Sequence, residues 1–134
     1  MQLATAVDNQ PWACNVHYYA DAAFNLCWVS TLKSKHSQDI AKNPKVAAAI
    51  MVHENTAAEP YVIGISIEGT AELIDQNVTK EIAEGYAAKH SEDDDMPAIV
   101  AGKHPFKFYR LEPSRIILFD NKNFPKDPRK ELNI

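Results

Sequence analysis

The segment FNLCWVSTLKSKHSQDIAKNP, residues 24–44, decides how this chain is interpreted. Its first seven residues are rich in aromatic and β-branched side chains, which predicts a strand that ends at Ser30. A helix is expected from about Ser34 to Lys42, with Ser34 as its N-cap and Pro44 preventing its continuation. Hydroxyl groups and cations would then surround the unpaired N–H groups of the first helical turn, an arrangement suited to a phosphate. The same residue types are also common on ordinary protein surfaces, so this pattern alone leaves both interpretations open.

Length and charge bound the function classes. A chain of 134 residues fits one domain, residues 1–134. Its formal charge of −4 argues against a nucleic-acid-binding protein, because phosphate backbones require a concentrated basic face. We expect no association with membranes, since no apolar run approaches the roughly 20 residues of a membrane span. The N-terminus lacks the pattern of a signal peptide, and we therefore expect a cytoplasmic protein.

The remaining segments predict mostly strands. We expect a mainly β (α+β) fold, a small barrel of about six antiparallel strands with two or three connecting helices. The 12–19 and 24–30 segments should form a hairpin, and the long 61–73 strand contains glycines typical of a bulge or a close backbone approach. The expected strands are 2–7, 12–19, 24–30, 46–52, 61–73, 106–111 and 114–120, and a second helix is expected over 77–90.

Several features lie outside this framework. Cys14 and Cys27 are expected to be reduced core residues. The basic C-terminal residues, from Lys122 to Lys130, have the composition of a solvated tail. The strands are more apolar on both faces than one core requires, which predicts a dimer.

Sites of other kinds are weakly supported. The five histidines show no pair at a spacing typical of metal ligands, so no metal site is expected. The acidic run 92–95 lacks the spaced ligands of a calcium loop and is expected to be a solvated turn. No known catalytic motif is present, and the catalytic residues therefore stay unknown.

Residues 3–73 resemble the FMN-binding split-barrel proteins of the pyridoxamine 5′-phosphate oxidase-like superfamily. The resemblance depends on the order and spacing of several pieces across half the chain, and the 108–113 and 120–121 segments fit the family's carboxyl-terminal pattern less specifically. The pieces are Leu3–Val7 with Pro11 and the strand 13–16, then Ser30, Ser34–His36, Ile40 and Asn43–Val46, and finally Ile67–Glu72.

The resemblance implies a role for each matching residue. Ser30 and Ser34 occupy the phosphate-binding hydroxyl positions, and Lys35 occupies the position of a cation that contacts the phosphate. His36 stands where lysine or arginine is common, and Lys33 in the same loop offers an alternative charge. The strand Ala13-Cys14-Asn15-Val16 matches the segment that runs along the isoalloxazine ring, and Val29 and Thr31 flank the phosphate position.

The implied protein is a homodimer with two FMN sites between its subunits, acting on an unknown small-molecule substrate. A flavin exchanges a hydride at N5 or single electrons, so no acid–base side chain is obligatory. Two alternatives remain open: a non-enzymatic flavin-binding or electron-carrying module, and the same fold binding deazaflavin F420 or haem, with His17 or His104 as a conceivable axial ligand. The C-terminal tail does not resemble the basic terminus of true pyridoxamine phosphate oxidases, which argues against that specific activity.

Overall fold

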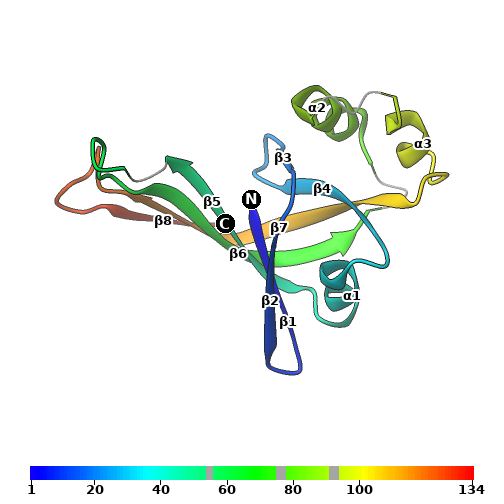
Figure 1. Cartoon of the computed structure of the whole chain (residues 1–134), viewed down its shortest axis with the longest axis horizontal. Helices are drawn as coiled ribbons and strands as arrows, with labels where there is room; N and C mark the ends of the chain where they lie inside the picture. The colour runs from blue at the N-terminus through cyan, green and yellow to red at the C-terminus, as the bar shows by residue number, and fades with distance from the viewer. Residues whose placement is uncertain (54–55, 75–77, 91–93) are drawn as a thin grey trace.

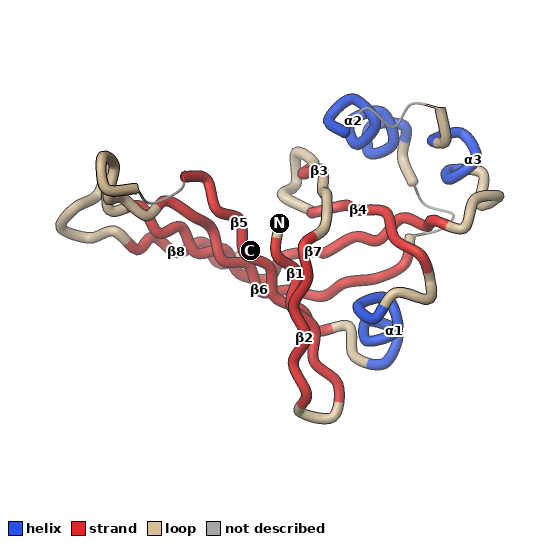
Figure 2. Tube along the Cα trace, in the orientation of Figure 1, coloured by secondary structure: helices blue, strands red, loops and turns tan. Residues whose placement is uncertain are grey.

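The computed structural model describes residues 1–53, 56–74, 78–90 and 94–134, and it is dominated by antiparallel strands (Figures 1 and 2). Helices within these residues number three, and the predicted α+β split-barrel class is confirmed. The strands are β1 (Gln2–Val7), β2 (Gln10–Asn15), β3 (Tyr19–Ala20), β4 (Leu26–Thr31), β5 (Lys45–His53), β6 (Ile63–Leu73), β7 (Phe106–Asp120) and β8 (Arg129–Asn133). The helices are α1 (Lys35–Lys42), α2 (Lys80–His90) and α3 (Met96–Val100).

The strands form one sheet in the order β2-β1-β5-β6-β7-β4-β3, with β8 paired to β7. One edge of β7 pairs with β6 along residues 109–120. Its other edge is shared, because β4 pairs with residues 106–111 and β8 with residues 115–119. In Figure 1 β5 and β8 extend to the left, β6 and β7 run across the view from one side to the other, and the β1–β2 hairpin projects downward. The sheet therefore splits along β7, with β4 and α1 on one side of the division.

The predicted hairpin between 12–19 and 24–30 is wrong for most of its length. Residues 10–15 pair with β1 instead, and only Tyr19 and Ala20 pair with β4. The physical reason is the turn at Asp8 and Asn9, whose φ angles are 51° and 61°. Such positive angles are typical of two-residue turns, whose backbone twist matches that of the two strands of a hairpin. The predicted 12–19 strand thus divides in two.

The predicted break near Pro113 is also wrong, because β7 runs unbroken from Phe106 to Asp120. The pairing register with β6 shifts there, from Glu68 opposite Arg115 to Gly69 opposite Pro113. A Cβ added to Gly69 would lie 2.2 Å from the Glu112 carbonyl oxygen, so the close approach predicted for this strand is confirmed. A bulge accommodates the proline, which has no N–H to give to a ladder.

The interpretation of the C-terminal residues as a solvated tail needs correction, because Arg129–Asn133 form β8. Asp120 builds the turn that returns the chain: its carboxylate accepts hydrogen bonds from the Lys122 and Asn123 backbone N–H groups at 3.1 and 2.9 Å. The Asn123 hydrogen bonds lower the pKa of Asp120, and the carboxylate is therefore ionised at neutral pH. This segment is basic and follows two prolines, and its composition is not typical of a strand.

The core lies between the sheet and the helices. Trp28 on β4 stacks on Tyr109 of β7 at 5.6 Å between ring centroids, and Tyr86 on α2 meets Phe108 edge-on at the same separation. Cys27 is buried in this core as predicted, and burial raises the pKa of its thiol to about 12. The predicted second helix begins at Lys80, and its expected first residue, Asn77, lies outside the described residues.

In the part of the chain that the structure describes, no helix combines the length and apolar character needed to cross a membrane.

Candidate functional site

The N-terminus of α1 is built as the sequence predicts. Ser34 is the N-cap, with extended backbone angles of −65° and 149°, and its hydroxyl accepts a hydrogen bond from the Ser37 N–H at 3.3 Å. The side-chain cap satisfies one of the four unpaired N–H groups of the first turn. The strand-to-helix connection thus presents backbone donors at the positive end of the helix dipole.

A hydroxyl–imidazole cluster, made of Ser30, Ser34, His36 and Ser37, gathers at this point. The Ser30 hydroxyl lies 3.0 Å from that of Ser34 and 2.8 Å from His36 Nε2. Ser34 Oγ lies 3.2 Å from the same nitrogen and donates to Ser37 Oγ at 2.8 Å. Ser37 was missed in the sequence, although its position three residues after an N-cap serine is a recognisable capping spacing.

The imidazole of His36 is held neutral at neutral pH. Burial lowers its pKa, and the nearby Asp39 carboxylate only partly opposes this effect. Its second nitrogen, Nδ1, lies 3.4 Å from the sulfur of Cys14 on β2. Burial also raises the pKa of the Cys14 thiol, which therefore stays protonated. The cluster consequently consists of neutral groups.

The two predicted lysines are not placed among these hydroxyls. The Lys35 ammonium lies 2.5 and 2.6 Å from the two carboxylate oxygens of Asp39, one turn further along α1. Asp39 is buried and also accepts a hydrogen bond from Thr5 of β1 at 2.8 Å, and Lys35 chiefly lowers the pKa of this carboxylate. The side chain of Lys33 is exposed to solvent.

A cavity of about 330 Å³ opens beside the hydroxyl–imidazole cluster. The predicted residues Asn15, Val16 and Val29 line it together with Ser30 and His36. Ala13 is exposed on β2 and Thr31 is half-buried, and neither lines the cavity. Because β2 is the last strand on its side of the sheet, backbone groups along one edge of the predicted 13–16 segment are not used by the sheet.

Part of the cavity lining is an aromatic wall, of which the sequence pointed only to His17, as a conceivable axial ligand. It consists of His17, Tyr86 and Phe106, which come from three distant parts of the chain. The ring of His17 lies 4.7 Å from that of His90, and His90 lies 4.6 Å from Tyr86. His90 donates from Nε2 to the Tyr18 carbonyl at 3.0 Å, which orients this group of rings. A planar ligand could stack on such a wall while its anionic end meets the hydroxyls.

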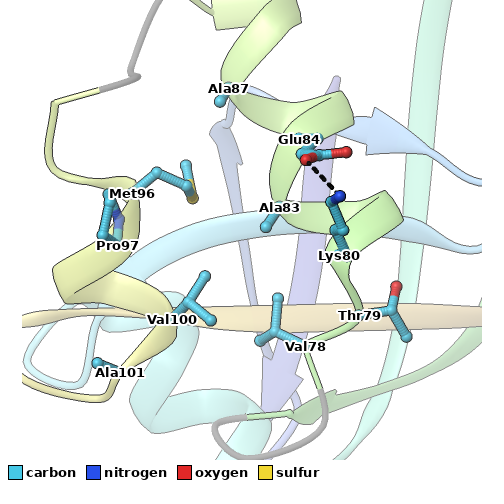
Figure 3. A pocket seen from close by; sticks show the side chains of 10 residues that line it. All are labelled: Val78, Thr79, Lys80, Ala83, Glu84, Ala87, Met96, Pro97, Val100 and Ala101. Carbon is cyan, nitrogen blue, oxygen red and sulfur yellow. Dashed lines mark ion pairs between the residues drawn. The ribbon is translucent and has the colours of Figure 1, made fainter.

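A larger hollow of about 680 Å³ lies between α2 and α3 (Figure 3). Its lining is mostly aliphatic, including Ala83, Ala87 and Val100, with the Lys80–Glu84 ion pair at 3.5 Å among the side chains drawn. Its polar lining residues are Thr79, Lys80 and Glu84, and none of the residues predicted to bind a cofactor lines it. Among the described residues, no group of three or more histidine, cysteine or carboxylate side chains is placed to hold a metal ion.

Comparison with known proteins agrees with this architecture. The family model for pyridoxamine 5′-phosphate oxidase matches residues 1–120. No curated protein matches the chain significantly.

Among solved structures, a conserved hypothetical protein from Mycobacterium tuberculosis is 18% identical with a TM-score of 0.71, over 92% of this chain and 78% of that one. A heme-binding protein from Mycobacterium smegmatis is 19% identical with a TM-score of 0.68, over 98% of this chain and 51% of that one, so this chain spans about half its length. An FAD-binding protein from Mesorhizobium loti is 20% identical with a TM-score of 0.56, over 86% and 78%. At these identities the likeness shows the fold alone.

Proposed function

This chain belongs to the pyridoxamine 5′-phosphate oxidase family, and from that premise we propose that it is an FMN-binding flavoprotein of oxidoreductase type. The observation that carries the proposal is the hydroxyl–imidazole cluster at the N-terminus of α1, beside a cavity with an aromatic wall. Hydroxyls, a histidine and helix N–H groups form a donor set that fits a phosphate ester. The FAD-binding protein of the same fold supports a flavin as the ligand.

The chain's own residues would bind and orient the cofactor. Ser30, Ser34 and His36 would hold the phosphate, while the unpaired edge of the 13–16 segment would hydrogen-bond the polar edge of the ring. Val29 would pack against the flavin, and Thr31 would flank the phosphate position. When bound, FMN supplies hydride or single-electron transfer to a small-molecule substrate.

The role of Lys35 depends on its ion pair with Asp39. The ammonium would add its charge to a phosphate only by leaving a carboxylate that lies 2.5 Å away. We therefore expect the neutral donors to contribute more than Lys35 does. Lys33, exposed in the same loop, would contribute long-range attraction, which salt screens.

The test is a titration of purified protein with FMN, followed by quenching of flavin fluorescence. Ser30→Ala should lose about 1.5–3 kcal/mol of binding free energy, or roughly 10- to 150-fold in Kd, because it removes a hydrogen bond to a charged group. Lys35→Met should lose less. Ser66→Ala, on an exposed position of β6, is the matched control and should bind like the wild type. A wild-type protein that leaves flavin fluorescence unchanged would contradict the proposal.

We further infer a homodimer with FMN between the subunits. Large apolar side chains stay exposed on one chain, among them Met51 at 64%, Val52 at 62% and Trp12 at 45%. A contiguous subunit interface would bury such surface. Light scattering should give twice the chain mass for the wild type and a shift toward the monomer for Val52→Lys. A wild-type monomer at micromolar concentration would refute the dimer.

Whether the protein turns over substrate separates an enzyme from a passive flavin carrier. An enzyme should oxidise NAD(P)H rapidly when flavin and an electron acceptor are both present, whereas a passive flavin carrier should not. The sequence and fold serve both functions equally well.

Haem is the second candidate ligand, favoured by one observation. His17 lines the cavity and stands beside His90, so an imidazole is available at the aromatic wall. Haem-binding proteins occur among the structures of this fold. Mass spectrometry of the small molecule that copurifies would distinguish FMN, F420 and haem, and loss of the haem absorption band in His17→Ala would assign the axial ligand.

A further inference from the structure

The ring of His36 is contacted at both of its nitrogens by side chains from different elements. Nδ1 lies 3.4 Å from the sulfur of Cys14 on β2, and Nε2 lies 2.8 Å from Ser30 Oγ and 3.2 Å from Ser34 Oγ. A neutral imidazole has one nitrogen that donates and one that accepts. The partner at Nδ1 therefore decides what Nε2 offers to the hydroxyls and to the cavity.

The surroundings of Cys14 make its sulfur a donor toward His36. His36 Nδ1 lies 3.4 Å from this sulfur, and a protonated thiol has one hydrogen to donate. The thiol is half-buried, which keeps it protonated at neutral pH. Its hydrogen can therefore be directed at His36 Nδ1, 3.4 Å away, when the proton of the imidazole is on Nε2.

We propose that Cys14 is a positioning residue that holds His36 in the tautomer with its proton on Nε2. In that state the Nε2–H donates toward Ser30 and Ser34, the Ser34 hydroxyl keeps its hydrogen bond to Ser37 Oγ, and the Ser30 hydroxyl hydrogen is free to turn into the cavity. In the opposite tautomer, the Nε2 lone pair would accept the hydrogen of one serine hydroxyl. The same lone pair would repel an anionic ligand. Cys14 thus makes the cluster a set of converging donors, which is what a phosphate requires.

This inference depends on the proposed function only for the identity of the ligand. The tautomer of His36 is a property of the protein without ligand and can be measured there. Nitrogen-15 NMR of histidine-labelled wild-type protein at neutral pH should show His36 with an acceptor-type Nδ1 and a protonated Nε2. The His36→Gln spectrum assigns the resonances among the five histidines. This measurement needs no cofactor and no variant of Cys14.

Substitutions then separate positioning from packing. Cys14→Ala should give a mixture of tautomers and weaken FMN binding about five- to tenfold, the effect of losing one net hydrogen bond. Cys14→Ser keeps a donor and should restore both the tautomer and the affinity. Cys27→Ala removes the other thiol, which is buried in the core, and should leave the His36 resonances unchanged.

Two results would overturn the proposal: a wild-type His36 protonated on Nδ1, or a Cys14→Ala protein with an unaltered His36 tautomer. If Cys14→Ala does not fold, the wild-type spectrum and the Cys14→Ser spectrum still decide the matter. A protein that fails to bind FMN but shows the Cys14-dependent tautomer would refute the proposed function and leave this inference standing.

Discussion

Replacing Gly69 with alanine tests how the bulge between β6 and β7 is built. The added Cβ would lie 2.2 Å from the Glu112 carbonyl oxygen and 3.0 Å from both Glu112 C and Pro113 Cα. All three are backbone atoms, so no side chain can rotate away to make room. The strands would have to separate at the point where β7 divides its edge between β4 and β8.

The expected cost follows from two opposing effects. Overpacking of a rigid site costs about 1–3 kcal/mol, and contacts with backbone alone place Gly69→Ala at the upper end of that range. Alanine recovers about 0.5–1 kcal/mol, because it loses less backbone entropy on folding than glycine does. The net result is a loss of about 2 kcal/mol in the free energy of unfolding, a large part of the 5–15 kcal/mol typical of a domain.

Urea unfolding followed by tryptophan fluorescence measures this change, since the fully buried Trp28 reports on the same sheet. Gly64→Ala is the matched control on the same strand. Its Cβ would lie 3.0 Å from the Ile50 carbonyl oxygen, a contact that a small backbone shift relieves, and we expect a change within about 1 kcal/mol. Equal stability of the two variants would refute the steric argument. We also expect Gly69→Ala to weaken FMN binding, because Ser30 is paired with Lys107 on the segment of β7 beyond the bulge.

Three further predictions concern local features. Phe24 has a φ of 65°, which is unfavourable for a side chain, and is 57% exposed. Phe24→Gly should therefore raise the free energy of unfolding by about 0.5–1 kcal/mol in urea denaturation. A loss of stability would instead show that packing of the phenyl ring stabilises the fold. Ser34→Ala removes the α1 cap and should cost about 1 kcal/mol, whereas Ser34→Asn, which keeps a capping oxygen, should retain most of the stability; equal losses would exclude capping as the cause. Burial lowers the pKa of His36 below its ordinary 6.5, so the unfolded chain takes up this proton first and stability falls as the pH drops below 6.5. His36→Gln should make the free energy of unfolding less dependent on pH between about pH 7 and about pH 5, and an unchanged slope would contradict the burial of a neutral imidazole.

Local sequence was sufficient wherever a structure depends on neighbours along the chain. The α1 helix lies between an N-cap serine and Pro44, and both boundaries follow from backbone chemistry within a few residues. The ion pair of Lys35 and Asp39 has the i,i+4 spacing of a helix pair and could have been predicted from the sequence as well. An ammonium held by such a pair is less available to a phosphate ligand.

Strand pairing was where local sequence failed. The 10–15 segment could pair with the strand before it or the strand after it, and a positive-φ turn at Asp8 and Asn9 decided the matter. Residues 129–133 lack the composition of a strand, yet they form β8 because the second half of β7 offers them a free edge. Pro113 was expected to end a strand, and a glycine 44 positions earlier in the chain, Gly69, allows the strand to continue.

The sequence by itself determined the fold family, the helix with its cap, and the presence of hydroxyl groups at that helix N-terminus. Only the tertiary structure decided that Cys14 meets His36, that Thr5 of β1 donates to the buried Asp39 carboxylate, and that Tyr86 and Phe106 line the same cavity as Ser30. The reason is physical: caps and turns are formed by groups a few residues apart, whereas side-chain contacts across a sheet depend on which strands pair and in which register, and a free-energy difference summed over the whole domain fixes both.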